Sequence, residues 1–297
     1  MNTRALGAAL LGAVVTSLTA VTFQLSEASP TTAAFIRPLV SLPLLAGLMV
    51  LTRRPDRRTH RERLLAVAGG AVFTIDIVLW MVAIDDIGAG LGTLLANTQV
   101  VIVPIVTWII FRERPTRQAL LAMPVVATGL VLVTGLGADT TYGANPVAGV
   151  VRGALAACFY SGFLIMFRRS NRRRAPMPGP LFDVGIGATA TALVIGAFSG
   201  DFDPTPTGSE FLWLLAVGVG AMTGWLLIGY ALPRLPAAHT SFAILLQPCL
   251  TVGWGALILA ERPSSIQLSG VVIVLGGIAF ATTPRGGEKR QSSSRSP

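Results

Sequence analysis

The sequence has little charge and almost no cysteine. Only 12% of its 297 residues are charged and 52% are hydrophobic, whereas roughly a quarter of a soluble domain is charged. A chain of this composition needs lipid around it. The two cysteines, Cys158 and Cys249, both fall in apolar runs, where a free cysteine behaves as a small hydrophobic residue. We therefore expect no disulfide framework, no metal site and no redox chemistry.

The sequence also lacks the motifs of enzymes and of ATP-driven pumps. It holds two histidines, His60 and His239, and no G-x-S-x-G, H-E-x-x-H or glycine-rich phosphate loop. We expect neither an enzyme nor a bound cofactor. The net charge of +9 would indicate a nucleic-acid partner only if the basic residues formed a patch on a soluble face. Here they lie between apolar runs, so no nucleic-acid partner is expected.

What the sequence does contain is a series of long apolar runs. A helix needs about 20 mostly apolar residues to cross the hydrocarbon of a bilayer. We predict an all-α integral membrane protein with ten transmembrane helices, at residues 5–25, 31–51, 64–84, 91–111, 119–136, 148–167, 181–198, 211–230, 238–259 and 266–282. The first run resembles a signal peptide in its flanks, but it is too long for one and nine more runs follow.

The basic residues predict the orientation of these helices. Twenty of the 23 lie on one side of the predicted arrangement, mainly in the connections 53–63, 112–117 and 168–174 and in the tail. Cytoplasmic loops collect Lys and Arg. We therefore expect a multi-pass protein of a bacterial cytoplasmic membrane with both termini in the cytoplasm. Residues 284–297 read as a disordered cytoplasmic tail.

An internal duplication divides the chain. Glu113-Arg114-Pro115 and Glu261-Arg262-Pro263 lie 148 residues apart, and at the same offset Thr93 falls on Ser241, Gln99 on Gln247 and Gly129 on Gly277. We interpret residues 1–147 and 148–283 as two five-helix halves. Because five is odd, the second half is predicted to sit upside down relative to the first. Inverted repeats with a site near the midplane are a common plan of secondary transporters.

These motifs support a family resemblance. The pattern from Gly90 through Thr93, Ala96 and Pro104 to Gly129, its echo from Ala238 to Gly277, and the sequence Phe35-Ile36-Arg37 resemble the drug/metabolite transporter superfamily, and within it the EamA-type exporters. The resemblance implies ten helices, a path lined by the third, fourth, eighth and ninth of them, and export of amino acids, related metabolites or toxic compounds. Gln247-Pro248 departs from the Glu-Pro of many relatives, and a neutral amide cannot carry a proton.

Two charged residues fall inside predicted spans at similar depth. They are Arg37 in the second span and Asp76 in the third. A charge in the bilayer is costly, so it usually faces protein or water. One interpretation is a buried ion pair that holds two helices together. The other makes Asp76 a proton or cation site tuned by Arg37, or makes Arg37 the partner of a substrate carboxylate.

Other polar and aromatic residues in the spans are candidates for the substrate pathway. Asp76 and Trp80 share a helix face, where a carboxylate beside an indole can receive an ammonium group, although Trp80 can equally be an interfacial anchor. Thr93 and Asn97 share a face, and Gln99 is expected to point elsewhere. Amides also bridge membrane helices, so these residues divide between pathway and helix contact. The full set of candidates is Asp76, Trp80, Asn97, Gln99, Trp225, Tyr230, Gln247 and Trp254.

The two Glu-Arg-Pro tripeptides are predicted to form turns. A glutamate that ends one helix and precedes the next is favoured at the amino end of the second helix. Thr116 and Ser264 are candidate N-caps of those helices. The repeat-signature residues of the turns are Glu113, Pro115, Glu261 and Pro263.

The sequence as a whole predicts a secondary transporter that exports a small organic solute by alternating access, with possible proton or ion coupling and with membrane lipid around it. The alternative is a channel or passive facilitator, since inverted repeats occur there too. A carrier saturates and shows counterflow, whereas a channel does not.

Overall fold

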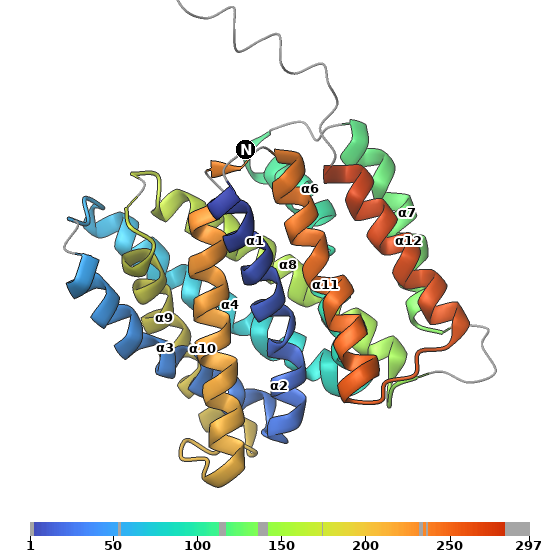
Figure 1. The fold of residues 1–297 in the computed structure, drawn as a ribbon, viewed down its shortest axis with the longest axis horizontal. Coiled ribbons are helices and arrows are strands. Elements are labelled where there is room, and N and C mark those ends of the chain that lie inside the picture. The colour runs from blue at the N-terminus through green and yellow to red at the C-terminus, as the bar shows by residue number, and fades with distance from the viewer. Residues whose placement is uncertain are drawn as a thin grey trace, which may run out of the picture.

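The computed structural model describes residues 3–52, 55–112, 117–135, 142–173, 175–231, 234–235 and 237–282. Within these residues the chain forms α-helices joined by short connections, without strands (Figure 1). The helices are α1 Thr3–Ser17, α2 Thr19–Ser26, α3 Pro30–Thr52, α4 His60–Ile87, α5 Ala89–Ala96, α6 Gln99–Phe111, α7 Arg117–Val133, α8 Pro146–Ser170, α9 Pro178–Ser199, α10 Gly208–Ala231, α11 Ala237–Ile258 and α12 Ser265–Thr282.

The helices are those of an integral membrane protein. In the described part of the chain, six segments are long and apolar enough to cross a bilayer: Thr3–Ser26, Pro30–Thr52, His60–Ile87, Pro146–Ser170, Pro178–Ser199 and Gly208–Ala231. Shorter apolar helices cover Leu120–Val133, Leu246–Ile258 and Ser265–Ala281. Large apolar side chains also face outward, among them Val50, Phe198 and Leu257, which are 73%, 88% and 79% exposed. Lipid covers such side chains without the cost that water imposes.

Two of the ten predicted spans are broken, contrary to the sequence prediction. The run 5–25 becomes α1 and α2 with Leu18 between them, and the run 91–111 becomes α5 and α6 with Asn97 and Thr98 between them. At the first break Ser17 Oγ donates to Val14 O (2.7 Å) and Thr19 Oγ1 to Thr16 O (2.7 Å). Side-chain hydroxyls that bond nearby carbonyls compete with the helical ladder.

The second break has the same physical origin. The Asn97 side chain donates to Thr93 O (2.9 Å), and Thr98 Oγ1 donates to Leu95 O (2.7 Å). The backbone tightens accordingly, because Asn97 N bonds Leu94 O and Thr98 N bonds Leu95 O, three residues back. Hydropathy cannot reveal such a break, since the residues around it remain apolar.

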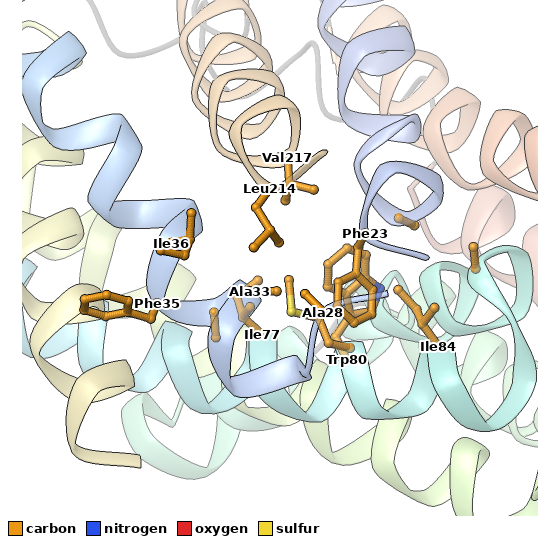
Figure 2. Packing of buried hydrophobic residues seen from close by; sticks show 14 of the residues in the cluster. Phe23, Ala28, Ala33, Phe35, Ile36, Ile77, Trp80, Ile84, Leu214 and Val217 are labelled. Atoms are coloured by element: carbon orange, nitrogen blue, oxygen red, sulfur yellow. The ribbon is translucent and has the colours of Figure 1, made fainter. Parts of the chain in front are cut away.

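Two apolar cores hold the helices together. The larger joins α2, α3, α4 and α10, and Figure 2 shows Phe23, Ile36 and Leu214 converging on Ile77 and Trp80 of α4. The second is formed by α5, α7, α8 and α12 with the end of α4; Leu91, Leu94, Val274 and Ile278 are fully buried there. In Figure 1, α12 lies along α7 and α1 along α10.

Glycines allow α4 and α9 to pack at very close range. A Cβ at Gly70 would overlap the carbonyl of Val184, and a Cβ at Gly187 would overlap the carbonyl of Val67. Beside this contact Thr74 Oγ1 donates to Ala188 O (3.0 Å). Small residues that bring backbones together are typical of helix contacts in membranes.

A charged network fastens the segment between α3 and α4 to α9. Arg58, only 6% exposed, pairs with Asp56 at 2.7 Å and with Asp183 at 2.6 Å. Burial raises the pKa of Asp56, but its hydrogen bonds and the charge of Arg58 outweigh this, so that the pKa lies below its usual value. In the sequence Arg58 is only one of the basic residues that predict the orientation. Its structural role depends on Asp183, which is 125 positions away in the chain.

Candidate functional site

A cavity of about 310 Å³ lies among the helices of both halves of the chain. Its lining comes from α1, α2, α3, α4, α5, α6, α8, α10 and α11 and from Leu235. Nearly all of the residues predicted for the pathway or the charge pair meet here: Arg37, Asp76, Trp80, Asn97, Gln99, Trp225 and Gln247.

The two charged residues line the cavity without touching each other. Asp76 is 3% exposed on α4. The Arg37 guanidinium carbon, from α3, lies 5.6 Å from the ring centre of Phe73 and 5.8 Å from that of Trp80, which flank Asp76 along α4. Opposite charges attract Arg37 and Asp76, yet the ion pairs among the described residues do not join them. Both residues therefore line the cavity, and Arg37 Nη1 has hydrogen-bonding capacity left over.

Unsatisfied polar atoms concentrate at this cavity. Arg37 Nη1, Trp80 Nε1, Thr93 Oγ1 and Gln99 Oε1 are buried without a hydrogen-bond partner, and all four residues line it. Among the described side chains, the one other such atom is Arg58 Nη1. Buried polar groups in native proteins are nearly always paired. These unpaired donors and acceptors are available to a polar group that enters the cavity.

Both helix breaks border the cavity. Thr16 and Thr19 flank the break at Leu18, and Thr93, Asn97 and Gln99 surround the break between α5 and α6. Gln99 lines the same cavity as Thr93 and Asn97, from the other side of the break between α5 and α6. Discontinuous helices bring backbone groups without a helical partner to a binding site.

An aromatic wall includes a residue that the sequence analysis missed. Tyr160 of α8 lines the cavity with Phe73 and Trp225. Its ring centre lies 6.0 Å from that of Phe73 and 6.3 Å from that of Trp225, edge to face with the latter. A tyrosine in the middle of an apolar run, and not at its end, is the signal that would have found it.

Two of the predicted pathway residues lie elsewhere. Tyr230 is 42% exposed, and the Arg234 guanidinium stacks 4.1 Å above its ring. Trp254 Nε1 donates to Ser17 Oγ (3.1 Å), and Thr251 Oγ1 donates to Ser17 O (3.1 Å), so this stripe of α11 fastens onto α1. Neither residue is part of the cavity lining.

Of the two Glu-Arg-Pro turns, only the second lies within the described residues. Glu113 and Pro115 lie outside the described residues. In the second turn, which contains Pro263, Ser264 caps α12 as predicted, because its Oγ accepts from Gln267 N (3.3 Å).

Glu261 of the same turn is 5% exposed and accepts hydrogen bonds from the backbone N–H groups of Ala89 and Gly90. It therefore caps α5 of the other half, which spacing along the chain cannot predict. Burial raises the pKa of Glu261, and these two hydrogen bonds only partly offset the rise.

The cavity is asymmetric along the helices. Ala9, Ala231 and Leu235 extend its lining toward the end where α1 begins and α10 finishes. At the opposite end, where α4 finishes and α5 begins, Ile84 and Ile87 are fully buried. Packed side chains therefore lie between the polar centre and the end where α4 finishes, and at the other end Ala9 and Ala231 are buried in a small apolar cluster with Leu235.

A comparison with known protein families identifies the family of this chain. The model of the EamA-like transporter family matches residues 3–135 and again residues 148–283. The chain belongs to the EamA-like transporter family. It is a multi-pass membrane transporter and not an enzyme, and the resemblance to the drug/metabolite transporter superfamily is confirmed.

Relatives of this EamA-like transporter carry names of the same kind. The chain is 25% identical over 218 residues to the pseudopaline exporter CntI of Pseudomonas aeruginosa, covering 73% of this chain and 74% of CntI. It is 22% identical to an uncharacterized transporter of Archaeoglobus fulgidus, covering 77% of each. A solved crystal structure is similar with a TM-score of 0.63 and 17% identity, covering 95% of this chain and 97% of the other, which supports the fold alone.

Proposed function

We propose that this protein is a secondary transporter that exports a small organic solute by alternating access. The observation that carries the proposal is the central cavity, in which buried polar atoms without partners surround a cation and an anion that do not pair. A solute with ionised or hydrogen-bonding groups satisfies these atoms while it is bound. The family resemblance and the similarity to the exporter CntI support export as the direction of transport.

The proposed architecture has ten spans in two inverted five-helix repeats, at residues 1–147 and 148–283. Two separate matches to one family model support the duplication, as does the offset of 148 residues between the Glu-Arg-Pro tripeptides. In this arrangement α1 with α2, and α5 with α6, each count as one interrupted span. The positive-inside pattern supports cytoplasmic termini, which makes the end where α1 begins and α10 finishes the cytoplasmic end.

Within the cavity the proposed roles follow from chemistry and position. Arg37 attracts an anionic group and Asp76 a cationic group or a coupling proton or ion. Trp80, Tyr160 and Trp225 supply aromatic faces, which suit apolar or cationic parts of a solute. Asn97, Gln99 and Gln247 offer amides from the fourth and ninth spans. Because Gln247 does not ionise, proton coupling is assigned to Asp76.

Flux measurements test the proposal. Purified protein in proteoliposomes loaded with labelled amino acids, amines and organic acids is expected to release at least one class of solute with saturation. Unlabelled solute on the opposite side should accelerate this release by counterflow. Protein-free vesicles and vesicles that contain an unrelated membrane protein are the controls. Release that stays linear with concentration and lacks counterflow would identify a channel or passive facilitator and contradict the proposal.

A further inference from the structure

The short helix α5 separates the cavity from the packed end of the bundle. Thr93 and Ala96, near its carboxyl end, line the cavity. Ala89 and Leu91, near its amino end, are fully buried, and so are Leu94 and Leu95. The helix has only eight residues, and it contacts α2, α4, α8, α11 and α12. The helix α5 therefore lies between the cavity and this end.

This helix is bounded by a non-helical joint on each side. Gly88, with φ of +88°, separates it from α4, and a side chain at that φ would be strained. Asn97 and Thr98 separate it from α6. Hinges are a few residues at element ends that absorb changes of backbone angle. Such residues lie at both ends of α5.

A side chain from the other half of the chain tethers α5. The Glu261 carboxylate accepts from Ala89 N and from Gly90 N (3.1 Å for the latter), and Glu261 N donates to Gly255 O (3.1 Å). A Cβ at Gly88 or at Gly255 would crowd the carboxylate, so these glycines leave room for it. An anion bonded to the first N–H groups of a helix is favourably placed in the field of the helix dipole.

We propose that α5 is the gate that closes this end of the cavity and that the Glu261 carboxylate is the latch that holds the gate shut. When Glu261 leaves the amino end of α5, the helix turns on its two joints and the cavity opens toward the side where α5 begins. This inference rests on the proposed alternating access, in which that side is extracellular. It gives Glu261 a role in transport beyond shaping a turn.

Labelling of a cavity cysteine tests the latch without any solute. Cys158 and Cys249 are replaced by alanine, and Ala96→Cys is introduced as the reporter in the cavity wall. A membrane-impermeant maleimide is added to intact cells, which expose the outer face, or to inverted vesicles, which expose the cytoplasmic face. With Glu261 present we expect labelling from the cytoplasmic face. In Glu261→Ala the rate of labelling from the outside is expected to rise at least tenfold, and in Glu261→Gln, which keeps one acceptor oxygen, by a smaller factor.

A matched control separates the latch from a general loss of stability. Gln267 is fully buried at the same end of the bundle, and its Nε2 donates to Val133 O (3.3 Å) and to Tyr142 O (2.9 Å), neither of which belongs to α5. Gln267→Leu should lower the melting temperature and leave outside labelling unchanged. Unchanged outside labelling in folded Glu261→Ala, or loss of folding in both Glu261 variants, overturns the latch. If the wild-type protein shows no flux, the proposed transport function is overturned. The labelling experiment still tests the latch in that case, because it needs no solute.

Discussion

At the scale of single residues, the separation of Arg37 and Asp76 bears on the two interpretations of these charges. A buried ion pair that holds helices together requires direct contact between the charges, and breaking such a pair costs about 3–5 kcal/mol. Arg37 instead lies beside the rings of Phe73 and Trp80, and its Nη1 has no partner. This geometry supports the proposed role of both charges in transport.

Asp76→Asn keeps the shape of the side chain and deletes its charge. We expect a folded protein whose flux falls about tenfold or more, which corresponds to roughly 1.4 kcal/mol, and whose flux no longer responds to pH. Proteoliposome flux and the melting temperature in detergent measure the two effects. In the double variant with Arg37→Gln we expect no recovery of flux. Joint recovery of stability and flux would show that the pair is structural.

Thr93 and Thr74 form a matched pair of buried hydroxyls. Thr93 Oγ1 has no partner in the cavity wall, whereas Thr74 Oγ1 donates to Gly70 O and Ala188 O. Thr93→Val is expected to leave the melting temperature unchanged or higher and to raise the KM for the solute. Thr74→Val should cost about 0.5–1.5 kcal/mol of stability and leave the KM unchanged. The opposite assignment of the two effects would remove Thr93 from the binding site.

At the scale of elements, the contact between α4 and α9 depends on glycine. Gly187→Ala places a methyl group against the Val67 carbonyl, so the helices must separate, and we expect a loss of about 1–3 kcal/mol. Gly47→Ala in α3 meets no atom within 4 Å and should be neutral or stabilising by up to about 1 kcal/mol. Thermal unfolding in detergent compares the two variants. Equal stability of both would mean that α4 and α9 adjust without cost.

Most of the helices were predictable from the sequence, and their interruptions were not. Apolar runs of sufficient length have few alternatives to helix in a bilayer, so the predicted spans fall on observed helices. The breaks at Leu18 and Asn97 depend on how hydroxyl and amide groups bond the local backbone. Polar and aromatic residues within apolar runs were predicted as pathway or charge-pair residues, and seven of them line the cavity: Arg37, Asp76, Trp80, Asn97, Gln99, Trp225 and Gln247.

The remaining site residues depend on tertiary packing. The placement of Tyr230 and Trp254 outside the cavity follows from how α10 and α11 are rotated about their axes, which single-helix periodicity does not determine. Glu261 was found as part of a repeated tripeptide, but its contact with Ala89 joins residues 172 positions apart. Only the assembled fold reveals such a cap.

At the scale of the whole molecule, the proposed orientation is open to a direct test. Cysteines at Arg57 and Arg172, both exposed between helices, are expected to resist an impermeant thiol reagent in intact cells. A cysteine at Thr207, exposed before α10, should react. Permeabilised cells, in which all three sites react, are the control. Reaction at position 172 with protection at position 207 would reverse the orientation and with it the side of the gate.

The two unpaired charges in the cavity wall have a consequence for the electrical behaviour of transport. When Arg37 and Asp76 are both ionised, the empty binding site carries no net charge, so the reorientation of the unloaded protein is insensitive to the membrane potential. Moving one elementary charge across a potential of 100 mV changes the free energy by about 2.3 kcal/mol. In the proposed alternating-access cycle, a dependence of flux on voltage therefore reports the charge that the solute and its coupling ion add to this neutral site, and a voltage titration reads that sum before the solute itself is identified.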